Sequence, residues 1–503
     1  MPVNRLRSLR ESYLLFQLQS SDLGRRFSSG IFWVLVGAGL GGGLKLASSI
    51  IVARLLGPGG FGQLGVIQST VVMFGLFAQL GLSVTATKYV AQERDENPAK
   101  AGRIIALSTL TGAASSTLVG SALFLLAPLL ATHTIAAPQL SPLLRIIAIK
   151  LFFDALNGAQ IGALAGMQSF RSVAKVNMVE GAISVPLLTV AVQLAGLSGA
   201  VGALVISAAV RWVVSQLILM AECRDRGIVI NYDFSRADWG ILWRLSLPAM
   251  LSNMMVGPTL WAANAIFVNQ PSGYIHMGIV NAVLQWRTWI LFLPLKTGEV
   301  LLPLLASREG GTNRKLNLMN ILLPWLAGSA LILPLMALAE PLSLLYGQAY
   351  ATPGFKYAMV LAMLSVAVLC YKDGLARLLT VNELMWWGVL SNLIWALILI
   401  LAMFYLRSFG PAGFTAALAV AYALNTVLFV PFYLKKGLIE PGLLLSRETL
   451  LVWTVLAIVA FAAVIDTILP VRVASLIGAY LVLGQLVRRL FLAGKPVHPP
   501  VSV

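Results

Sequence analysis

Charged residues, and carboxylates above all, are scarce in this chain. Only 11% of its 503 residues are charged, and 36 lysines and arginines face 19 aspartates and glutamates. Soluble proteins average about 25% charged residues, so the composition excludes a soluble globular protein. With 58% hydrophobic residues, the chain is predicted to cross a membrane many times.

Cysteine, histidine and nucleotide-binding motifs are equally sparse. Cys223 and Cys370 lie far apart in sequence, so no disulfide framework is expected. The three histidines have no metal-ligand spacing; they are His133, His276 and His498. The absence of a P-loop excludes ATP as an energy source within this chain. We therefore expect no metal and no cofactor, and a proton or sodium gradient is the candidate source of energy.

Large extramembrane segments are also missing, which bears on enzyme activity. An integral-membrane glycosyltransferase or polymerase would be expected to carry a sizeable outer loop with carboxylates. The longest outer loop predicted here, about 339–356, contains only one, Glu340. We therefore expect a transporter and not an enzyme. A non-transporting scaffold or polymerase partner fits less well, because many charges lie inside the predicted spans.

Long apolar runs separated by turn signals predict an all-α polytopic membrane protein with about 14 transmembrane helices; 12 is the competing number. The predicted centres lie near residues 42, 75, 117, 156, 185, 211, 255, 289, 327, 368, 396, 423, 458 and 482. Basic residues crowd every second loop, so these loops and both termini are predicted to be cytoplasmic. The net charge of +17 thus has a topological explanation, and no nucleic-acid partner is expected.

An internal repeat divides the predicted helices into two lobes. Gly196-Leu197-Ser198-Gly199 resembles Gly410-Pro411-Ala412-Gly413 at an offset of 214 residues, which favours two six-helix lobes related by a pseudo-two-fold axis. The predicted segments are a basic cytoplasmic tail, 1–29; an N-lobe, 30–222; a C-lobe, 241–436; two extra helices, 447–492; and a cytoplasmic tail, 493–503.

The first predicted span contains a charge where lipid would be expected. Lys45 lies within the apolar run 31–52, on a face shared with Gly37, Gly41, Ser48 and Ser49. A stripe of small and polar residues beside a charge suggests a helix that faces a polar cavity. Gly57-Pro58-Gly59-Gly60 follows; it cannot continue a helix and is predicted to form the outer turn.

Other predicted spans carry charges as well, and cations outnumber carboxylates by seven to three. Such an excess would focus the electric field for an anionic ligand.

Three pairs spaced for local ion pairing have a structural interpretation: Lys150–Asp154, Lys296–Glu299 and Asp373–Arg377. Four cations without a partner along their own helix favour ligand binding: Lys45, Arg211, Arg287 and Lys372. An aromatic stack is predicted for Arg287 within Gln285-Trp286-Arg287-Thr288-Trp289. The candidate substrate-binding cations are Lys45, Arg211, Arg287, Lys150, Lys372 and Arg377, and the candidate coupling carboxylates are Asp154, Glu299 and Asp373.

Several short motifs occur in order along the chain. They are Arg54-Leu55-Leu56-Gly57-Pro58 with Phe61-Gly62, Leu80-Gly81-Leu82, Val90-Ala91, Pro303-Leu304-Leu305-Ala306-Ser307-Arg308, and Glu340-Pro341-Leu342 with Leu345-Tyr346-Gly347. Together they resemble the polysaccharide transporter family of the multidrug/oligosaccharidyl-lipid/polysaccharide exporter superfamily, which contains the O-antigen flippases.

The resemblance implies two lobes around a central cavity with alternating access. It also implies a flippase that moves polyprenyl-diphosphate-linked oligosaccharide from the inner to the outer leaflet of the bacterial cytoplasmic membrane, for surface polysaccharide synthesis. The implied partners are membrane lipids, a polysaccharide polymerase and chain-length proteins. By similarity to the lipid II flippases of the superfamily, Lys45 and Arg287 would match cavity arginines, and the last two helices would line a lipid groove.

Two alternatives stay open within the same superfamily. One is a lipid II flippase. The other is a cation-coupled multidrug exporter, although such a protein should have a cavity rich in carboxylates, and the excess of cations argues against it. Arginine suits a diphosphate because its planar fork donates two parallel hydrogen bonds, whereas lysine acts as a point charge.

Overall fold

The computed structural model describes residues 22–234, 239–240, 254–306, 314–382, 384–439, 446–465 and 468–488, with the backbone alone for 22–38, 40–41, 293–306, 314–318 and 380. Helices joined by short connections make up these residues, and no β-strand occurs among them. Within the described part, eight helices are long and apolar enough to cross a membrane. The predicted all-α polytopic fold is therefore confirmed. The predicted tail 493–503 lies outside the described residues, as does most of the tail 1–29.

The predicted span centres agree with the helices along the whole described chain. Every centre except residue 255 lies inside a helix, and residue 255 directly precedes α9, Val256–Val268. Two helices are long enough for two spans each: α2, Asp22–Gln79, and α6, Phe170–Asp225. Each is interrupted by a glycine with positive φ, Gly57 at 66° and Gly196 at 54°. The predicted break is present at Gly57, because glycine adopts this backbone conformation without steric cost. The prediction that Pro58-Gly59-Gly60 could not be helical was wrong: these residues belong to the second half of α2, where proline is tolerated in a first turn.

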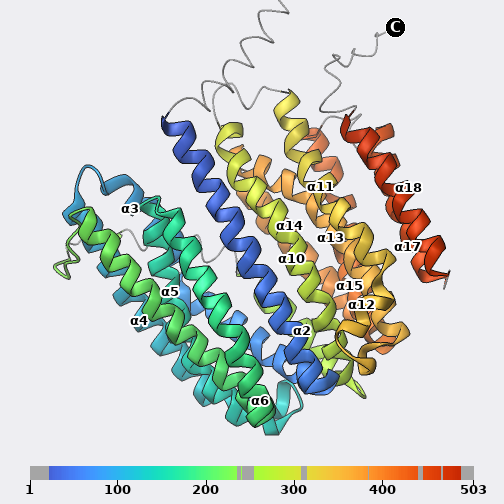
Figure 1. Cartoon of the computed structure of the whole chain (residues 1–503), viewed down its shortest axis with the longest axis horizontal. Helices are drawn as coiled ribbons and strands as arrows, with labels where there is room; N and C mark the ends of the chain where they lie inside the picture. The colour runs from blue at the N-terminus through green and yellow to red at the C-terminus, as the bar shows by residue number, and fades with distance from the viewer. Residues whose placement is uncertain are drawn as a thin grey trace, which may run out of the picture. The chain divides into compact units, whose positions relative to one another are not determined.

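The chain divides into two compact units, of which unit 1 comprises Met1–Leu56 and Gln63–Trp261. Besides most of α2 and all of α6, it contains α3, Leu82–Glu93; α4, Pro98–Leu129; and α5, Ser141–Gly166. Helix α5 packs against α3, α4 and α6 (Figure 1). Glycines on α5 allow the close approach to α3: a Cβ at Gly162 would lie 2.3 Å from the Ser83 carbonyl oxygen. Thr87 and Arg94 of this region donate hydrogen bonds to the backbone of α5, at 3.1 and 3.0 Å.

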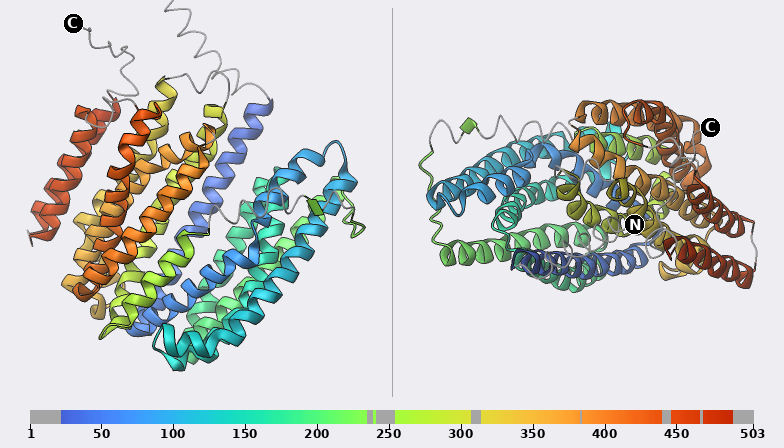
Figure 2. Two further views of the ribbon diagram at one scale, coloured as in Figure 1. Left: turned by 180° about the vertical axis from the view of Figure 1, so that it is seen from behind. Right: turned by 90° about the horizontal axis from the view of Figure 1, so that it is seen from above.

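Unit 2 comprises Gly57–Gly62 and Ala262–Val503. After the end of α9, its helices are α10, Gly273–Ala306; α11, Arg314–Ala337; α12, Ala339–Leu345; α13, Pro353–Val381; α14, Met385–Leu406; α15, Gly410–Lys435; α17, Arg447–Val464; and α18, Leu469–Val487. Helix α13 packs against α10, α11 and α15, and α17 pairs with α18 (Figure 2). The segment Gly57–Gly62 reaches α10 through two glycines, Gly62 and Gly278, at which a Cβ would lie 1.9 Å from a carbonyl oxygen.

The predicted repeat is visible in the local backbone of each unit. Gly196 has φ 54° and ψ −132°, and Gly410, 214 residues later, has φ 61° and ψ −142°. The second glycine of each motif touches a backbone carbonyl: a Cβ at Gly199 would lie 1.8 Å from the Ala191 oxygen, and one at Gly413 would lie 1.9 Å from the Leu406 oxygen. The two motifs therefore make the same turn for the same steric reason.

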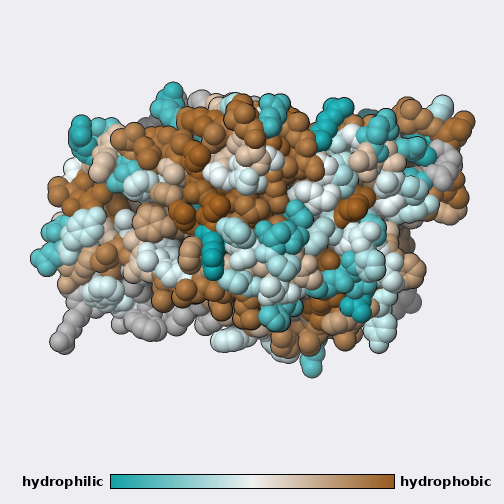
Figure 3. Space-filling view, turned by 90° about the horizontal axis from the view of Figure 1, so that it is seen from below, coloured by the Kyte–Doolittle hydropathy of each residue, from teal (hydrophilic) through white to brown (hydrophobic). Residues whose placement is uncertain are grey.

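Apolar side chains also cover much of the outer surface of the helices. Brown, apolar residues are prominent among teal ones in the space-filling view of Figure 3. Examples with at least two thirds of their surface exposed are Leu118, Leu125, Leu194, Trp386, Tyr405 and Phe461. So much exposed apolar surface would be a liability in water, and it fits helices that contact lipid.

Candidate functional site

Lys45 extends from the first half of α2 and meets a carboxylate that comes from α6. Its Nζ atom lies 3.2 Å from Oε1 of Glu180, and its side chain is 54% exposed while that of Glu180 is 13% exposed. One turn further along α2, Ser48 is buried. The predicted polar face of this helix thus carries an exposed cation paired with a partly buried carboxylate.

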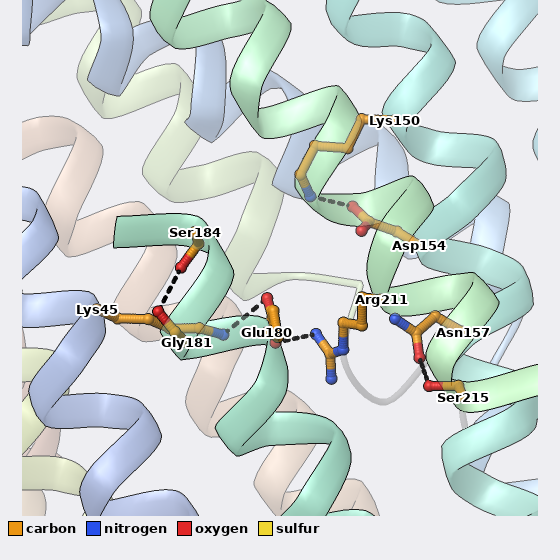
Figure 4. Close-up of polar contacts among 9 residues, drawn as sticks. All are labelled: Lys45, Lys150, Asp154, Asn157, Glu180, Gly181, Ser184, Arg211 and Ser215. Atoms are coloured by element: carbon orange, nitrogen blue, oxygen red, sulfur yellow. Dashed lines mark hydrogen bonds and ion pairs between the residues drawn. The ribbon is translucent and has the colours of Figure 1, made fainter. Parts of the chain in front are cut away.

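Arg211 reaches the same carboxylate from the second half of α6. Its NH1 atom lies 3.3 Å from Oε2 of Glu180, so each carboxylate oxygen faces a different cation (Figure 4). Glu180 and Arg211 lie equally far from the kink at Ala195–Gly196, which brings the two halves of α6 side by side. The Ser172 hydroxyl donates to Glu222 across the same halves at 2.6 Å. We call Lys45, Glu180 and Arg211 the unit 1 charge cluster.

The sequence interpretation missed Glu180. It treated Lys45 and Arg211 as cations without local partners, and this holds only along their own stretches of helix, because the partner arrives through tertiary structure. The signal was nevertheless present: Glu180 is a carboxylate in the apolar run Met178-Val179-Glu180-Gly181. The test that singled out the other charges inside spans would also have found it. Its inclusion raises the intramembrane carboxylates from three to four and leaves the cations in excess.

Polar atoms around the cluster are not satisfied by the described protein atoms. The hydroxyls of Ser48, Ser49 and Ser207 are buried without a hydrogen-bond partner among the described residues, and so is Nε of Arg211. Oε2 of Glu180 likewise makes no aligned hydrogen bond, although it lies within ion-pair distance of Arg211. Buried polar groups are normally hydrogen bonded, so this region suits water or a polar ligand.

The neighbouring candidates on α5 are satisfied by their own side chains. Lys150 and Asp154 form the predicted ion pair one turn apart. Three residues further, the Asn157 carbonyl accepts a hydrogen bond from the Ser215 hydroxyl at 3.1 Å. Figure 4 shows both contacts beside the unit 1 charge cluster.

In unit 2, two of the candidate cations have partners from α15. Arg287 donates a hydrogen bond to the Tyr422 hydroxyl at 3.1 Å, and its guanidinium carbon lies 5.8 Å from the centre of that ring. The aromatic partner of Arg287 among the described residues is therefore a tyrosine on another helix, and not one of the neighbouring tryptophans of the predicted stack. Lys372 donates to the side-chain carbonyl of Asn425, which also accepts from the Ser391 hydroxyl at 3.1 Å.

Arg377 is the most enclosed of the candidate cations, with a side chain 8% exposed. It forms the predicted ion pair with Asp373 and donates from Nε to Asn320 Oδ1 at 2.6 Å and from NH2 to the Asn320 carbonyl at 3.1 Å. Asn320 in turn donates to the Gly374 carbonyl at 2.8 Å. Every nitrogen of the guanidinium is thus bonded within unit 2, which is the pattern of a structural contact between α11 and α13.

For two charged residues predicted to lie inside a span, the structure describes the backbone alone. Lys296 and Glu299 belong to α10, but their side chains lie outside the described residues. Among the described residues, no group of three or more His, Cys, Asp or Glu side chains could hold a metal ion.

Comparison with protein families and curated proteins gives three matches. A family model described as "Polysaccharide biosynthesis protein" matches residues 27–309. The chain is similar to the EPS I polysaccharide export inner membrane protein EpsE of Ralstonia solanacearum, with 26% identity over 274 residues, which are 54% of this chain and 61% of EpsE. EpsE of Ralstonia nicotianae is 25% identical over 268 residues, 52% of this chain and 60% of that protein. The matched region is thus less than two thirds of the length of these relatives.

Solved structures with the same fold cover more of the chain. The lipid II flippase MurJ in an inward closed conformation matches 91% of this chain and 98% of that chain, with 12% identity and a TM-score of 0.68. An inward-facing multidrug resistance MATE family transporter of the MOP superfamily matches 78% and 94%, with 15% identity and a TM-score of 0.64. At these identities the likeness concerns the fold alone, and it is the fold of MOP superfamily transporters.

Proposed function

Because the chain belongs to the polysaccharide biosynthesis protein family, we propose that it is a flippase for polyprenyl-diphosphate-linked oligosaccharide. It moves the lipid-linked oligosaccharide from the inner to the outer leaflet of the bacterial cytoplasmic membrane, for surface polysaccharide synthesis. Two findings support a role in polysaccharide export: the transporter folds of the similar solved structures, and the export function in the name of EpsE. The chain acts by transport and not by chemical conversion.

The observation that carries the proposal is the meeting of Lys45 and Arg211 on a polar face of unit 1. Two cations share one carboxylate, so the unit 1 charge cluster has a net charge of +1. Charges inside a membrane are costly unless protein, water or a ligand compensates them. An anionic diphosphate supplies that compensation, and the unbonded serine hydroxyls beside the cluster supply further donors for its oxygens.

The mechanism follows from this chemistry. The cluster binds the diphosphate and replaces part of the hydration that the phosphates lose on leaving water. The polyprenyl chain stays in the bilayer, because its transfer to water would cost about 0.8 kcal/mol for each methylene exposed. Alternating access of the two lobes then exposes the head group on the outer side.

The test is surface glycan export by cells that carry single substitutions at the cluster. Arg211→Glu should abolish export, because a second carboxylate beside Glu180 would repel the diphosphate, while Arg211→Lys should keep part of it, because the charge remains and only the planar fork is lost. Lys45→Glu should also abolish export. Membrane protein levels are measured in parallel, and normal levels with lost export support a binding role.

The matched control is Lys175→Glu, a charge reversal at an exposed position on the same helix, α6. It should export at the original rate. Normal export by well-expressed Lys45→Glu and Arg211→Glu variants would rule out the diphosphate site. Loss of protein in both variants, with full export by the protein that remains, would assign the cluster a structural role.

A further inference from the structure

We propose that Glu180 is an internal counter-anion, which occupies the two cations of the unit 1 charge cluster until the anionic head group of the substrate displaces it. This inference rests on the proposed function, since it assigns a regulatory role at the same site. Glu180 presents one oxygen to Lys45 and the other to Arg211, at 3.2 and 3.3 Å. A phosphate group would place two of its oxygens toward the two cations in the same way.

Donors on the helix turns next to the two cations remain without a hydrogen bond in the described part of the chain. The donor Nε of Arg211 and the hydroxyls of Ser48, Ser49 and Ser207 are buried, yet they have no hydrogen-bond partner among the described residues. A carboxylate has two oxygens, and both already face the cations. A diphosphate has more oxygens and could bond to the cations and to these remaining donors together. The unused donors therefore point to an anion larger than a carboxylate.

Charge explains why a transporter would keep a carboxylate at an anion site. Lys45 and Arg211 without Glu180 would be two uncompensated cations, which are costly in the membrane and would hold a diphosphate tightly. With Glu180 present, binding becomes an exchange of one anion for another, and like-charge repulsion between Glu180 and the diphosphate favours release. The accessibility of the two cations suits this exchange, because the side chains of Lys45 and Arg211 are 54% and 27% exposed while that of Glu180 is 13% exposed.

The experiment measures the binding of farnesyl diphosphate, a short prenyl diphosphate, to the purified full chain. Glu180→Gln keeps the size of the side chain and removes its charge, so its Kd should fall about tenfold or more relative to the original protein. Export by the same variant should slow, because release is impaired. The matched control is Glu93→Gln, which neutralises a similarly buried carboxylate paired with Lys100 in unit 1 and should change neither value.

The possible results separate this inference from the function on which it rests. An unchanged or higher Kd for Glu180→Gln, with binding still abolished by Arg211→Glu, would overturn the counter-anion and leave the cationic site standing. Absence of binding in both the original protein and Glu180→Gln would overturn both. If Glu180→Gln folds poorly, Glu180→Asp is measured in its place, because it keeps the charge but shortens the side chain that reaches the two cations. A lower Kd for farnesyl diphosphate in Glu180→Asp supports the proposal, and an unchanged or higher Kd contradicts it.

Discussion

The positive charges of two arginines, Arg377 and Arg211, are compensated by different kinds of surroundings. Arg377 has all of its nitrogens bonded to Asp373 and Asn320, and only 8% of its side chain is exposed. Arg211 faces a single carboxylate, keeps Nε without a partner among the described residues, and is 27% exposed. The first arrangement fixes two helices together, whereas the second leaves donors for a ligand. Both arginines were among the candidate substrate-binding cations, but in the sequence Arg377 already had a local partner in Asp373 and Arg211 had none, and the structure agrees with this distinction.

This difference predicts opposite effects of substitution at the two sites. Arg377→Ala should destabilise the protein by about 3–5 kcal/mol, because it leaves the partly buried Asp373 without its cation and the buried Asn320 without its donors. Arg211→Ala should leave thermal stability nearly unchanged, because Glu180 keeps Lys45 as a partner. Thermal unfolding of the purified variants measures both effects. A stable Arg377→Ala variant that has lost only transport would make Arg377 a ligand-binding residue instead.

The candidate coupling carboxylates can also be tested by single substitutions that remove their charge. Asp154→Asn should slow gradient-driven transport while farnesyl diphosphate binding stays the same, since Asp154 pairs with Lys150 and not with the cluster. Transport into vesicles is measured with and without an imposed proton or sodium gradient. Glu299→Gln and Asp373→Asn are measured in the same way. The transport rate of Asp373→Asn is divided by its protein level, because the ion pair with Arg377 is lost and the protein is expected to be less stable. Original rates in all three variants would mean that coupling does not run through these residues.

At the level of the helices, the repeat predicts that Gly→Ala substitutions at the equivalent positions Gly199 and Gly413 lower stability to a similar extent. A Cβ at Gly199 or Gly413 would overlap a backbone carbonyl, which cannot move as a flexible side chain can. Gly199→Ala and Gly413→Ala should therefore each cost about 1–3 kcal/mol through overpacking. Gly202→Ala is the control on the same helix as Gly199, because a Cβ there has no heavy atom within 4 Å.

The measurement for this prediction is the level and thermal stability of folded protein in the membrane. Equal losses at Gly199 and Gly413 with no loss at Gly202 would support a common turn. A large loss at one glycine of the pair and none at the other would show that the similar backbone angles have no common energetic basis.

The helices could be predicted from the sequence because their signals are local. Apolar length marks each span, and glycine at Gly57 and Gly196 marks turns that other residues resist. The i,i+4 pairs Lys150–Asp154 and Asp373–Arg377 were also predictable, since helix geometry alone brings them together. The partners of Lys45, Arg211, Arg287 and Lys372 were not. They come from other helices, or from the other half of a folded-back helix, and spacing along the chain carries no information about them.

For the whole molecule, the alternation of basic loops predicts one orientation in the membrane, with both termini in the cytoplasm. Single cysteines introduced at Glu96 and Lys436, exposed positions in basic loops, should resist an impermeant thiol reagent in intact cells and react after the membrane is opened. Cysteines at His133 and Ser408, exposed in the other set of loops, should react at once. Cys223 and Cys370 are buried and give a low background, which serine substitution at both removes. Reaction of the first pair in intact cells would reverse the orientation.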